Sequence, residues 1–276
     1  MTDKQNTKFS KNFWTVIVME FFERGSYYGV MSVLSVYLVL NVNEGGLGFS
    51  KEGVGVIKSV ITPMLYLLPI LSGAIADKFG YRKTLIFAFI VMSSGYFLTS
   101  FASSYGFVFA TLLLMVLGAG FFKPIISGTI ARETNESNST KGFGIFYWSI
   151  NLGAFIFPLI IVPYLKAISW SYIFIMAAIG TGSMLFVTLF VYKEPKKPET
   201  TKSIVEVFKN IVLVLKDFRF IIMIVIYSLF WILYFQMFDT VLWYLTEYVD
   251  MTPVDNMVNG FLSIFVNNPG WKFDAE

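Results

Sequence analysis

The sequence has no cysteine and no histidine in its 276 residues. Without these residues the chain forms no disulfide, no Cys/His metal site, no cysteine nucleophile and no Ser-His-Asp triad. Charged residues are also scarce, at 14% of the chain, and they occur in clusters. An enzyme is therefore the least favoured functional class. The lack of cysteine also removes the usual sequence indicator of the redox compartment.

Apolar residues, in contrast, are abundant. They make up 56% of the chain, with 30 phenylalanines, and the mean hydropathy is +0.67. A soluble domain of this length does not bury so much apolar surface in one core. Seven apolar runs are long enough to cross a hydrocarbon core of ~30 Å as helices. They cover residues 13–40, 54–76, 83–102, 106–131, 143–165, 170–192 and 219–248. The sequence thus predicts an all-α integral membrane protein, whose first run is too long for a cleaved signal peptide.

The basic residues between the runs predict the orientation. Most lie in alternate segments, namely the N-terminus, 77–82, 132–142 and 193–218. The opposite side has few, namely Lys51, Lys166 and Lys272. Because cytoplasmic loops carry an excess of Lys and Arg, we expect a cytoplasmic N-terminus in a multi-pass protein of the cell membrane.

The spacing of the runs predicts three regions. Residues 1–192 are expected to form a six-helix bundle, and residues 193–218 a cytoplasmic amphipathic linker that begins where Pro195 and Pro198 end the sixth helix. Residues 219–276 would begin a C-terminal bundle with one span and an extracytoplasmic segment. Six spans plus one is an unexpected number for a two-bundle protein. We therefore expect a chain truncated after its seventh span.

The first run contains three charged residues, Glu20, Glu23 and Arg24. At ~100° per residue they share an arc of about 140° with Tyr27 and Tyr28. Charges inside a span are costly, so this face must contact protein or water rather than lipid. Glu20 and Arg24 are four residues apart and are expected to pair directly.

A fourth intramembrane charge, Lys123, follows Gly118 and Gly120 and precedes Pro124 in "GAGFFKPIISG". The glycines allow close helix approach, and the proline is expected to kink the helix. With the three charges of the first run, the formal sum is zero. Two interpretations remain open: a functional site for protons or substrate, or a salt-bridge network that only holds helices together.

Other polar residues also allow two interpretations. Tyr66 fits packing or cavity lining, Asn151 an interhelical hydrogen bond or a cavity, and Asp239 a cavity or the outer interface. In the turn after the second run, Arg82 is expected to hold the loop on the cytoplasmic side. The Asp77 carboxylate lies at the C-terminal end of a helix, where the helix dipole disfavours negative charge, so it needs a partner. The next helix N-terminus and a helix outside this chain are two examples of such a partner.

Four strings resemble known transporter motifs. "GAIADKFGYRK" resembles the loop motif of the major facilitator superfamily. "EFFERGSYYG", "GAGFFKP" and "FYWSINLGAF" resemble motifs of the proton-coupled oligopeptide transporters within that superfamily. The four strings follow the expected order on the expected spans, and the resemblance covers roughly residues 12–240. It implies a major-facilitator-type N-terminal six-helix bundle followed by the first helix of the C-terminal bundle.

The resemblance also implies residue roles. Proton coupling would fall to two carboxylates, Glu20 and Glu23. Substrate binding would fall to six residues: Arg24, Tyr27, Tyr28, Tyr66, Lys123 and Asn151. Gating would fall to Asp77 and Arg82. No cofactor is implied beyond protons as the coupling ion, and the partners would be a small peptide or other small solute, the lipid bilayer and the missing C-terminal bundle, with no nucleic acid.

The sequence departs from the family pattern at three positions. Gly25 replaces an aromatic residue, Ile125 replaces a common asparagine, and Phe235 replaces a glutamate of the seventh span. Asp239 follows Phe235 by one helical turn and is a candidate substitute. The leading hypothesis is a proton-driven carrier of di- and tripeptides that works by alternating access. The alternatives are a related carrier of a non-peptide solute, with or without proton coupling, and a non-transporting membrane scaffold or sensor.

Overall fold

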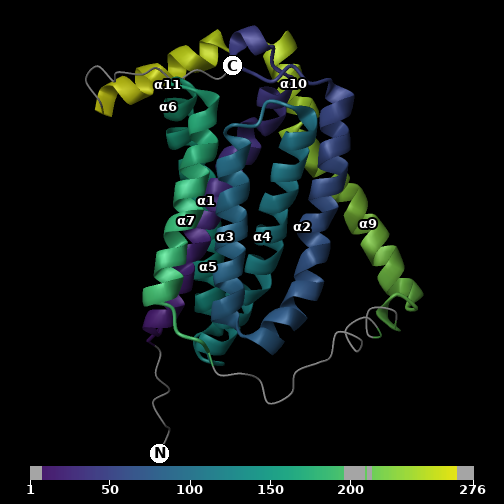
Figure 1. Ribbon diagram of the computed structural model, residues 1–276, viewed down its shortest axis with the longest axis vertical. Helices are drawn as coiled ribbons and strands as arrows, with labels where there is room; N and C mark the ends of the chain where they lie inside the picture. The colour runs from purple at the N-terminus through teal and green to yellow at the C-terminus, as the bar shows by residue number, and fades with distance from the viewer. Residues whose placement is uncertain (1–7, 196–208, 210–212, 266–276) are drawn as a thin grey trace, which may run out of the picture.

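The computed structural model describes residues 8–195, 209 and 213–265, and within them the regular structure is entirely helical. The first four long helices are α1 (Lys11–Val39), α2 (Lys51–Phe79), α3 (Tyr81–Thr99) and α4 (Tyr105–Glu133). A 3₁₀ turn at Val42–Glu44 follows α1. These helices and two further ones stand side by side in a bundle (Figure 1). The fold class that the sequence predicts is confirmed.

The fifth span is interrupted. Helix α5 (Ser139–Ile156) continues through a π-helical turn at Phe157–Ile161 into the short α6 (Val162–Lys166), and α7 (Trp170–Phe190) follows. Proline has no N–H to donate and its ring clashes with the preceding turn, which favours such a local rearrangement. Pro158 lies inside the π turn and Pro163 just after it. The sequence analysis did not predict this interruption.

The seventh span is also divided. Helix α9 (Phe218–Phe235) leads through a 3₁₀ turn at Gln236–Phe238 into α10 (Thr240–Tyr248). No residue of α9 is buried. At the end of the molecule near the N-terminus, α9 stands away from α2, whereas α10 lies close to the bundle (Figure 1). Most of the expected amphipathic linker lies outside the described residues.

An additional helix, α11 (Thr252–Phe265), occupies part of the expected extracytoplasmic segment. Its apolar residues recur at helical spacing, which explains the helix. They include Val254, Met257, Phe261 and Ile264, all exposed.

The packing of the bundle depends on close approaches between helices. The most extensive contacts join α3 to α4 and α7, α2 to α4, and α1 to α5 and α7. A Cβ on Gly118 would lie 2.6 Å from the backbone nitrogen of Met92, and one on Gly120 would lie 2.5 Å from the Cβ of Leu68. The close helix approach predicted for these two glycines is therefore confirmed. Helix α4 continues through Pro124 without an interruption of its helical assignment.

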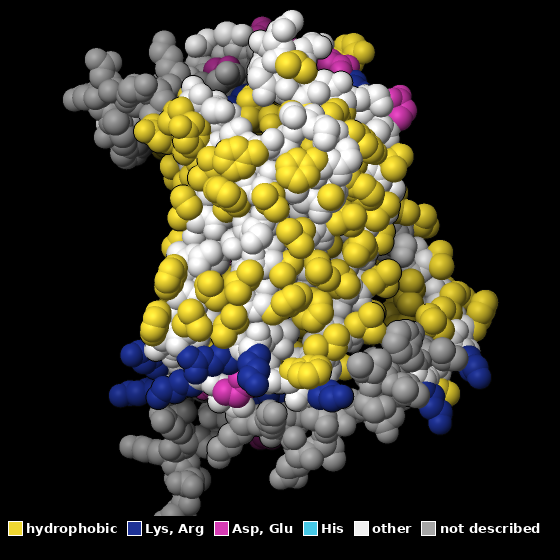
Figure 2. Space-filling view, viewed as in Figure 1, with side chains coloured by type: hydrophobic (Ala, Val, Ile, Leu, Met, Phe, Trp, Pro, Cys, Tyr) yellow, Lys and Arg dark blue, Asp and Glu magenta, His cyan; other side chains and the backbone are white. Residues whose placement is uncertain are grey.

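The outer surface is suited to a bilayer. Figure 2 shows a broad apolar band around the middle of the bundle and a collection of Lys and Arg at the end where the N-terminus lies. Within the described residues, five helical segments are long and apolar enough to span a membrane. They are Lys51–Phe79, Tyr105–Glu133, Ser139–Lys166, Trp170–Phe190 and Phe218–Tyr248. All seven expected helices exist, but α1, which carries three charges in its middle, and α3 are not among these five.

Candidate functional site in the six-helix bundle

The charged residues of α1 form one buried cluster. The side chain of Glu23 is 0% exposed, and Glu20 and Arg24 are also buried. Arg24 donates to both oxygens of Glu23, from Nε over 2.5 Å and from a terminal nitrogen over 2.6 Å. Its Nε lies 3.5 Å from the nearer carboxylate oxygen of Glu20. The expected pair of Glu20 and Arg24 therefore exists, but the bidentate pair with Glu23 is the tighter one.

Lys123 of α4 lies near this cluster and is not ion-paired in it. Among the described residues no carboxylate lies within salt-bridge distance of its ammonium. The charges of Glu20, Glu23 and Arg24 still act on it electrostatically. Its Nζ lies 5.0 Å from the centre of the Tyr66 ring, a cation–π distance. The predicted set of four charges is thus one tight triad plus a lysine that faces an aromatic ring.

Aromatic rings surround the charges. The guanidinium of Arg24 lies 4.9 Å from the centre of the Tyr27 ring, and the rings of Tyr27 and Tyr28 are 5.3 Å apart. The ring of Tyr66, which is 52% exposed, lies 6.2 Å from that of Phe235 on α9. The position at which the resemblance predicted a glutamate therefore contributes an aromatic ring to the same group of side chains.

Asn151 of α5 is exposed. Its side-chain amide donates to the carbonyl oxygen of Tyr147, one turn earlier in the same helix, over 2.9 Å. The structure therefore does not show the interhelical hydrogen bond that was one of the two interpretations of this residue. The amide oxygen makes no hydrogen bond within the described part of the chain.

Asp239 joins the seventh span to the six-helix bundle. Its carboxylate accepts from the ammonium of Lys58 on α2 and from the hydroxyl of Ser35 on α1. The ammonium of Lys58 also donates to the Ser35 hydroxyl over 2.8 Å. We call these three residues the outer latch. Sequence analysis missed Lys58 and Ser35, although a lysine inside an apolar run is the same signal that identified Lys123.

Two further contacts extend the outer latch along α10. The indole nitrogen of Trp243 donates to the backbone carbonyl of Ser35 over 3.2 Å. Lys51 at the start of α2 pairs with Glu247 near the end of α10. The latch therefore holds α10, rather than α9, against α1 and α2.

Asp77, near the end of α2, pairs with Arg132 of α4 over 2.9 Å. Asp77 therefore has the partner that it was expected to need, and that partner comes from α4, which was not one of the two examples. The guanidinium of Arg132 also lies 4.2 Å from the centre of the Tyr81 ring. Helix α4, which carries Lys123 in its second half, thus also supplies the cation that pairs with the Asp77 carboxylate.

Comparison with known proteins identifies the family. The profile of the Major Facilitator Superfamily matches residues 14–268. The chain belongs to the Major Facilitator Superfamily.

Relatives within this superfamily are transporters. The chain is 32% identical over 154 residues to the uncharacterized transporter YclF of Bacillus subtilis (strain 168), which is 55% of this chain and 31% of YclF. It is 30% identical over 202 residues to a di-/tripeptide transporter of Lactococcus lactis subsp. lactis (strain IL1403), which is 68% of this chain and 41% of that protein. Among solved structures it resembles the peptide transporter POT in complex with sulfate, with a TM-score of 0.63 and 25% identity over 92% of this chain and 50% of that one.

These matches confirm the resemblance to the proton-coupled oligopeptide transporters. They also agree with the prediction that the chain is a multi-pass membrane protein and not an enzyme. The chain spans half or less of the length of these relatives.

The loop motif between α2 and α3 is held by a group of contacts separate from the outer latch. We call this group the α3–α7 clamp. The carboxylate of Glu194 accepts from the backbone N–H groups of Tyr81 and Arg82 over 2.6 and 2.7 Å. The Arg82 side chain donates to the carbonyl of Thr188 over 3.3 Å and to that of Leu189. A carboxylate thus caps the start of α3 while a guanidinium binds the end of α7, each with the sign that the helix dipole favours. The sequence analysis did not anticipate the role of Glu194.

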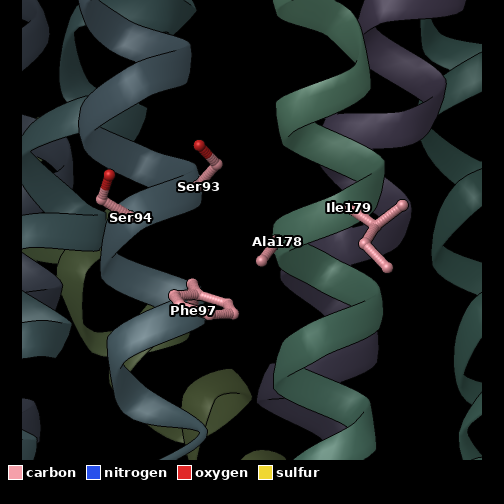
Figure 3. Close-up of a pocket in the computed structure, with 5 residues that line it drawn as sticks. All are labelled: Ser93, Ser94, Phe97, Ala178 and Ile179. Carbon is pink, nitrogen blue, oxygen red and sulfur yellow. The ribbon is translucent and has the colours of Figure 1, made fainter.

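A groove of about 290 Å³ lies between α3 and α7. Ser93, Ser94 and Phe97 come from α3, and Ala178 and Ile179 from α7; Phe97 and Ala178 point into the space between the helices (Figure 3). None of these lining residues is charged, and Phe97 and Ile179 are exposed on the outer surface of the bundle. The groove is therefore separate from the charged cluster.

Proposed function

We propose that this member of the Major Facilitator Superfamily carries di- and tripeptides across the cell membrane together with protons. The observation that carries the proposal is the buried bidentate pair of Glu23 and Arg24, near the ammonium of Lys123, which has no carboxylate partner among the described residues. A buried ion pair adds little net stability because of its desolvation cost, so charges inside a span favour a functional role. A peptide carboxylate competes with Glu23 for Arg24, and a proton competes with Arg24 for the Glu23 carboxylate.

Each residue then has a chemical role. Arg24 and Lys123 bind the peptide carboxylate, because both are cations and Lys123 has no carboxylate partner in the described residues. Tyr27, Tyr28 and Tyr66 line the peptide pocket, and the exposed amide of Asn151 faces the peptide N-terminus. When Arg24 turns toward substrate, the Glu20 and Glu23 carboxylates lose their counter-charge and take up protons more readily. Substrate and proton binding are coupled in this way.

Alternating access requires two gates, and the contacts supply a candidate for each. The outer latch of Ser35, Lys58 and Asp239 closes one end by joining α10 to α1 and α2. At the opposite end, α9 stands away from α2 (Figure 1), and we assign the second gate to this end. Asp77 and Arg82 belong to that end. Its excess of Lys and Arg (Figure 2) favours a cytoplasmic location, with the N-terminus inside.

A related carrier of a non-peptide solute, without proton coupling, is the second candidate. Phe235 favours it, because an aromatic ring replaces the glutamate that the family pattern has in the seventh span. Under this alternative Arg24 and Lys123 bind another organic anion, and the carboxylates of α1 only balance charge.

A ligand-stabilisation screen distinguishes the two candidates. The thermal midpoint of the purified complete protein would be measured with dipeptides, tripeptides, sugars, nitrate and organic anions. We expect stabilisation by di- and tripeptides that is lost in Lys123→Ala and kept in Lys141→Ala, a control at the exposed start of α5. Stabilisation by a non-peptide anion, with no response to any peptide, supports the second candidate and contradicts the first.

A further inference from the structure

One buried side chain near the charged cluster has no role in the account above. Tyr96 of α3 is fully buried, and its hydroxyl has no hydrogen-bond partner among the described residues. A polar group that loses its contact with water without gaining another partner destabilises the folded state. Tyr96 is one of the largest fully buried side chains, so its ring fills core volume that phenylalanine would fill equally well. The hydroxyl therefore needs an explanation of its own.

The position of this hydroxyl supplies one. The charges of Glu23 and Arg24 act on it, and so does Tyr27. Tyr96 is thus within electrostatic range of the bidentate pair, and the side chains of Tyr96 and Glu23 are both inaccessible to solvent. In the conformation described, Arg24 occupies both oxygens of Glu23. The Tyr96 hydroxyl then has no hydrogen-bond partner among the described residues, while both oxygens of the nearby Glu23 carboxylate are already paired.

We propose that Tyr96 is a positioning residue for the Glu23–Arg24 pair, whose hydroxyl donates to the Glu23 carboxylate when Arg24 leaves it. The proposal rests on the proposed function in one respect, that Arg24 turns toward the substrate during the cycle. A phenol suits this task because it can donate to a carboxylate and also accept from a guanidinium. The Tyr96 hydroxyl thereby lowers the free-energy cost of separating Arg24 from Glu23.

A double-mutant cycle without ligand tests this inference. The thermal midpoint of the complete protein would be measured for the parent, Tyr96→Phe, Arg24→Lys and the double variant. Lysine keeps the charge but cannot bind both carboxylate oxygens in the bidentate manner of arginine, so it leaves room on Glu23 for Tyr96. We expect Tyr96→Phe to leave the parent midpoint unchanged or higher. In the Arg24→Lys background it should lower the midpoint by roughly 4 °C or more.

The matched control is Tyr192→Phe. Tyr192 is also buried, but its hydroxyl is paired with that of Thr129 at 2.8 Å. We expect Tyr192→Phe to lower the midpoint equally in both Arg24 backgrounds. The inference is overturned if Tyr96→Phe also has the same effect in both backgrounds, because the tyrosine then contributes packing alone.

A second measurement covers the case in which Arg24→Lys does not fold. Tyr96→Phe should then weaken dipeptide binding about tenfold or more, as expected for the loss of a hydrogen bond to a charged group, without a fall in thermal midpoint. Unchanged binding would overturn the inference. The ligand-free cycle needs no peptide, so a protein that binds no peptide would contradict the proposed function while the cycle still decides the role of Tyr96.

Discussion

The ring of Phe157 occupies the space that a side chain on Gly25 would need. A Cβ at Gly25 would lie 2.4 Å from two atoms of that ring. Phe157 begins the π turn of the fifth span and contacts the ring of Phe21 on α1 edge to face, with centres 5.7 Å apart. The family pattern has an aromatic residue at position 25. Here glycine leaves that space to the ring of Phe157 from the fifth span.

This relationship predicts the effect of restoring a side chain at position 25. Gly25→Ala should destabilise the protein by about 1–3 kcal/mol, because the ring of Phe157 has to move. Gly144→Ala is the matched control on α5, where a Cβ meets no atom within 4 Å. It should be neutral or stabilising, because alanine favours a helix by about 1 kcal/mol over glycine. Thermal unfolding in detergent measures both.

The same contact predicts a rescue. Gly25→Ala combined with Phe157→Leu should be more stable than the sum of the two single changes predicts, because the smaller side chain leaves room for the methyl group. Additive effects of the two substitutions would contradict the steric coupling of positions 25 and 157.

The outer latch predicts asymmetric effects of removing one or both charges. The side chains of Lys58 and Asp239 are 13% and 23% exposed, so the pair is mostly buried. Asp239→Asn should cost about 1–3 kcal/mol, below the 3–5 kcal/mol of a fully buried pair, because it leaves the ammonium without a counter-charge. The double change Lys58→Met with Asp239→Leu should be less damaging than Asp239→Asn.

The pair of Lys51 and Glu247 provides the control for the latch. These side chains are 39% and 42% exposed, and such pairs contribute about 0–1 kcal/mol. Glu247→Gln should therefore have little effect on thermal unfolding. A loss from Glu247→Gln equal to that from Asp239→Asn would show that the latch has no special role.

The α3–α7 clamp predicts a stabilising role for Glu194. Glu194→Ala leaves two backbone N–H groups at the start of α3 without their acceptor and should cost about 0.5–2 kcal/mol, as for the loss of other helix caps. Glu136→Ala, in the exposed turn before α5, should change the unfolding midpoint little. Equal unfolding midpoints for the two variants would show that Glu194 does not stabilise the start of α3.

Sequence reasoning predicted the seven helices because continuous apolar runs have few structures available in a bilayer. It identified the α1 charges and Lys123 because charges are rare inside spans. It missed the π turn, since prolines near a helix end fit several local geometries. It did not identify the partner of Asp77 or that of Asp239. Arg132 and Lys58 come from other helices, and such contacts depend on how helices pack rather than on local pattern.

Proton-driven peptide uptake tests the central claim most directly. The complete protein in liposomes would be given labelled dipeptide under an inward pH gradient, with and without a proton uncoupler, and compared with Lys123→Ala and Lys141→Ala. The account predicts accumulation that the uncoupler abolishes, that Lys123→Ala reduces at least tenfold, and that Lys141→Ala preserves. No accumulation, or accumulation that neither the uncoupler nor Lys123→Ala affects, would contradict it.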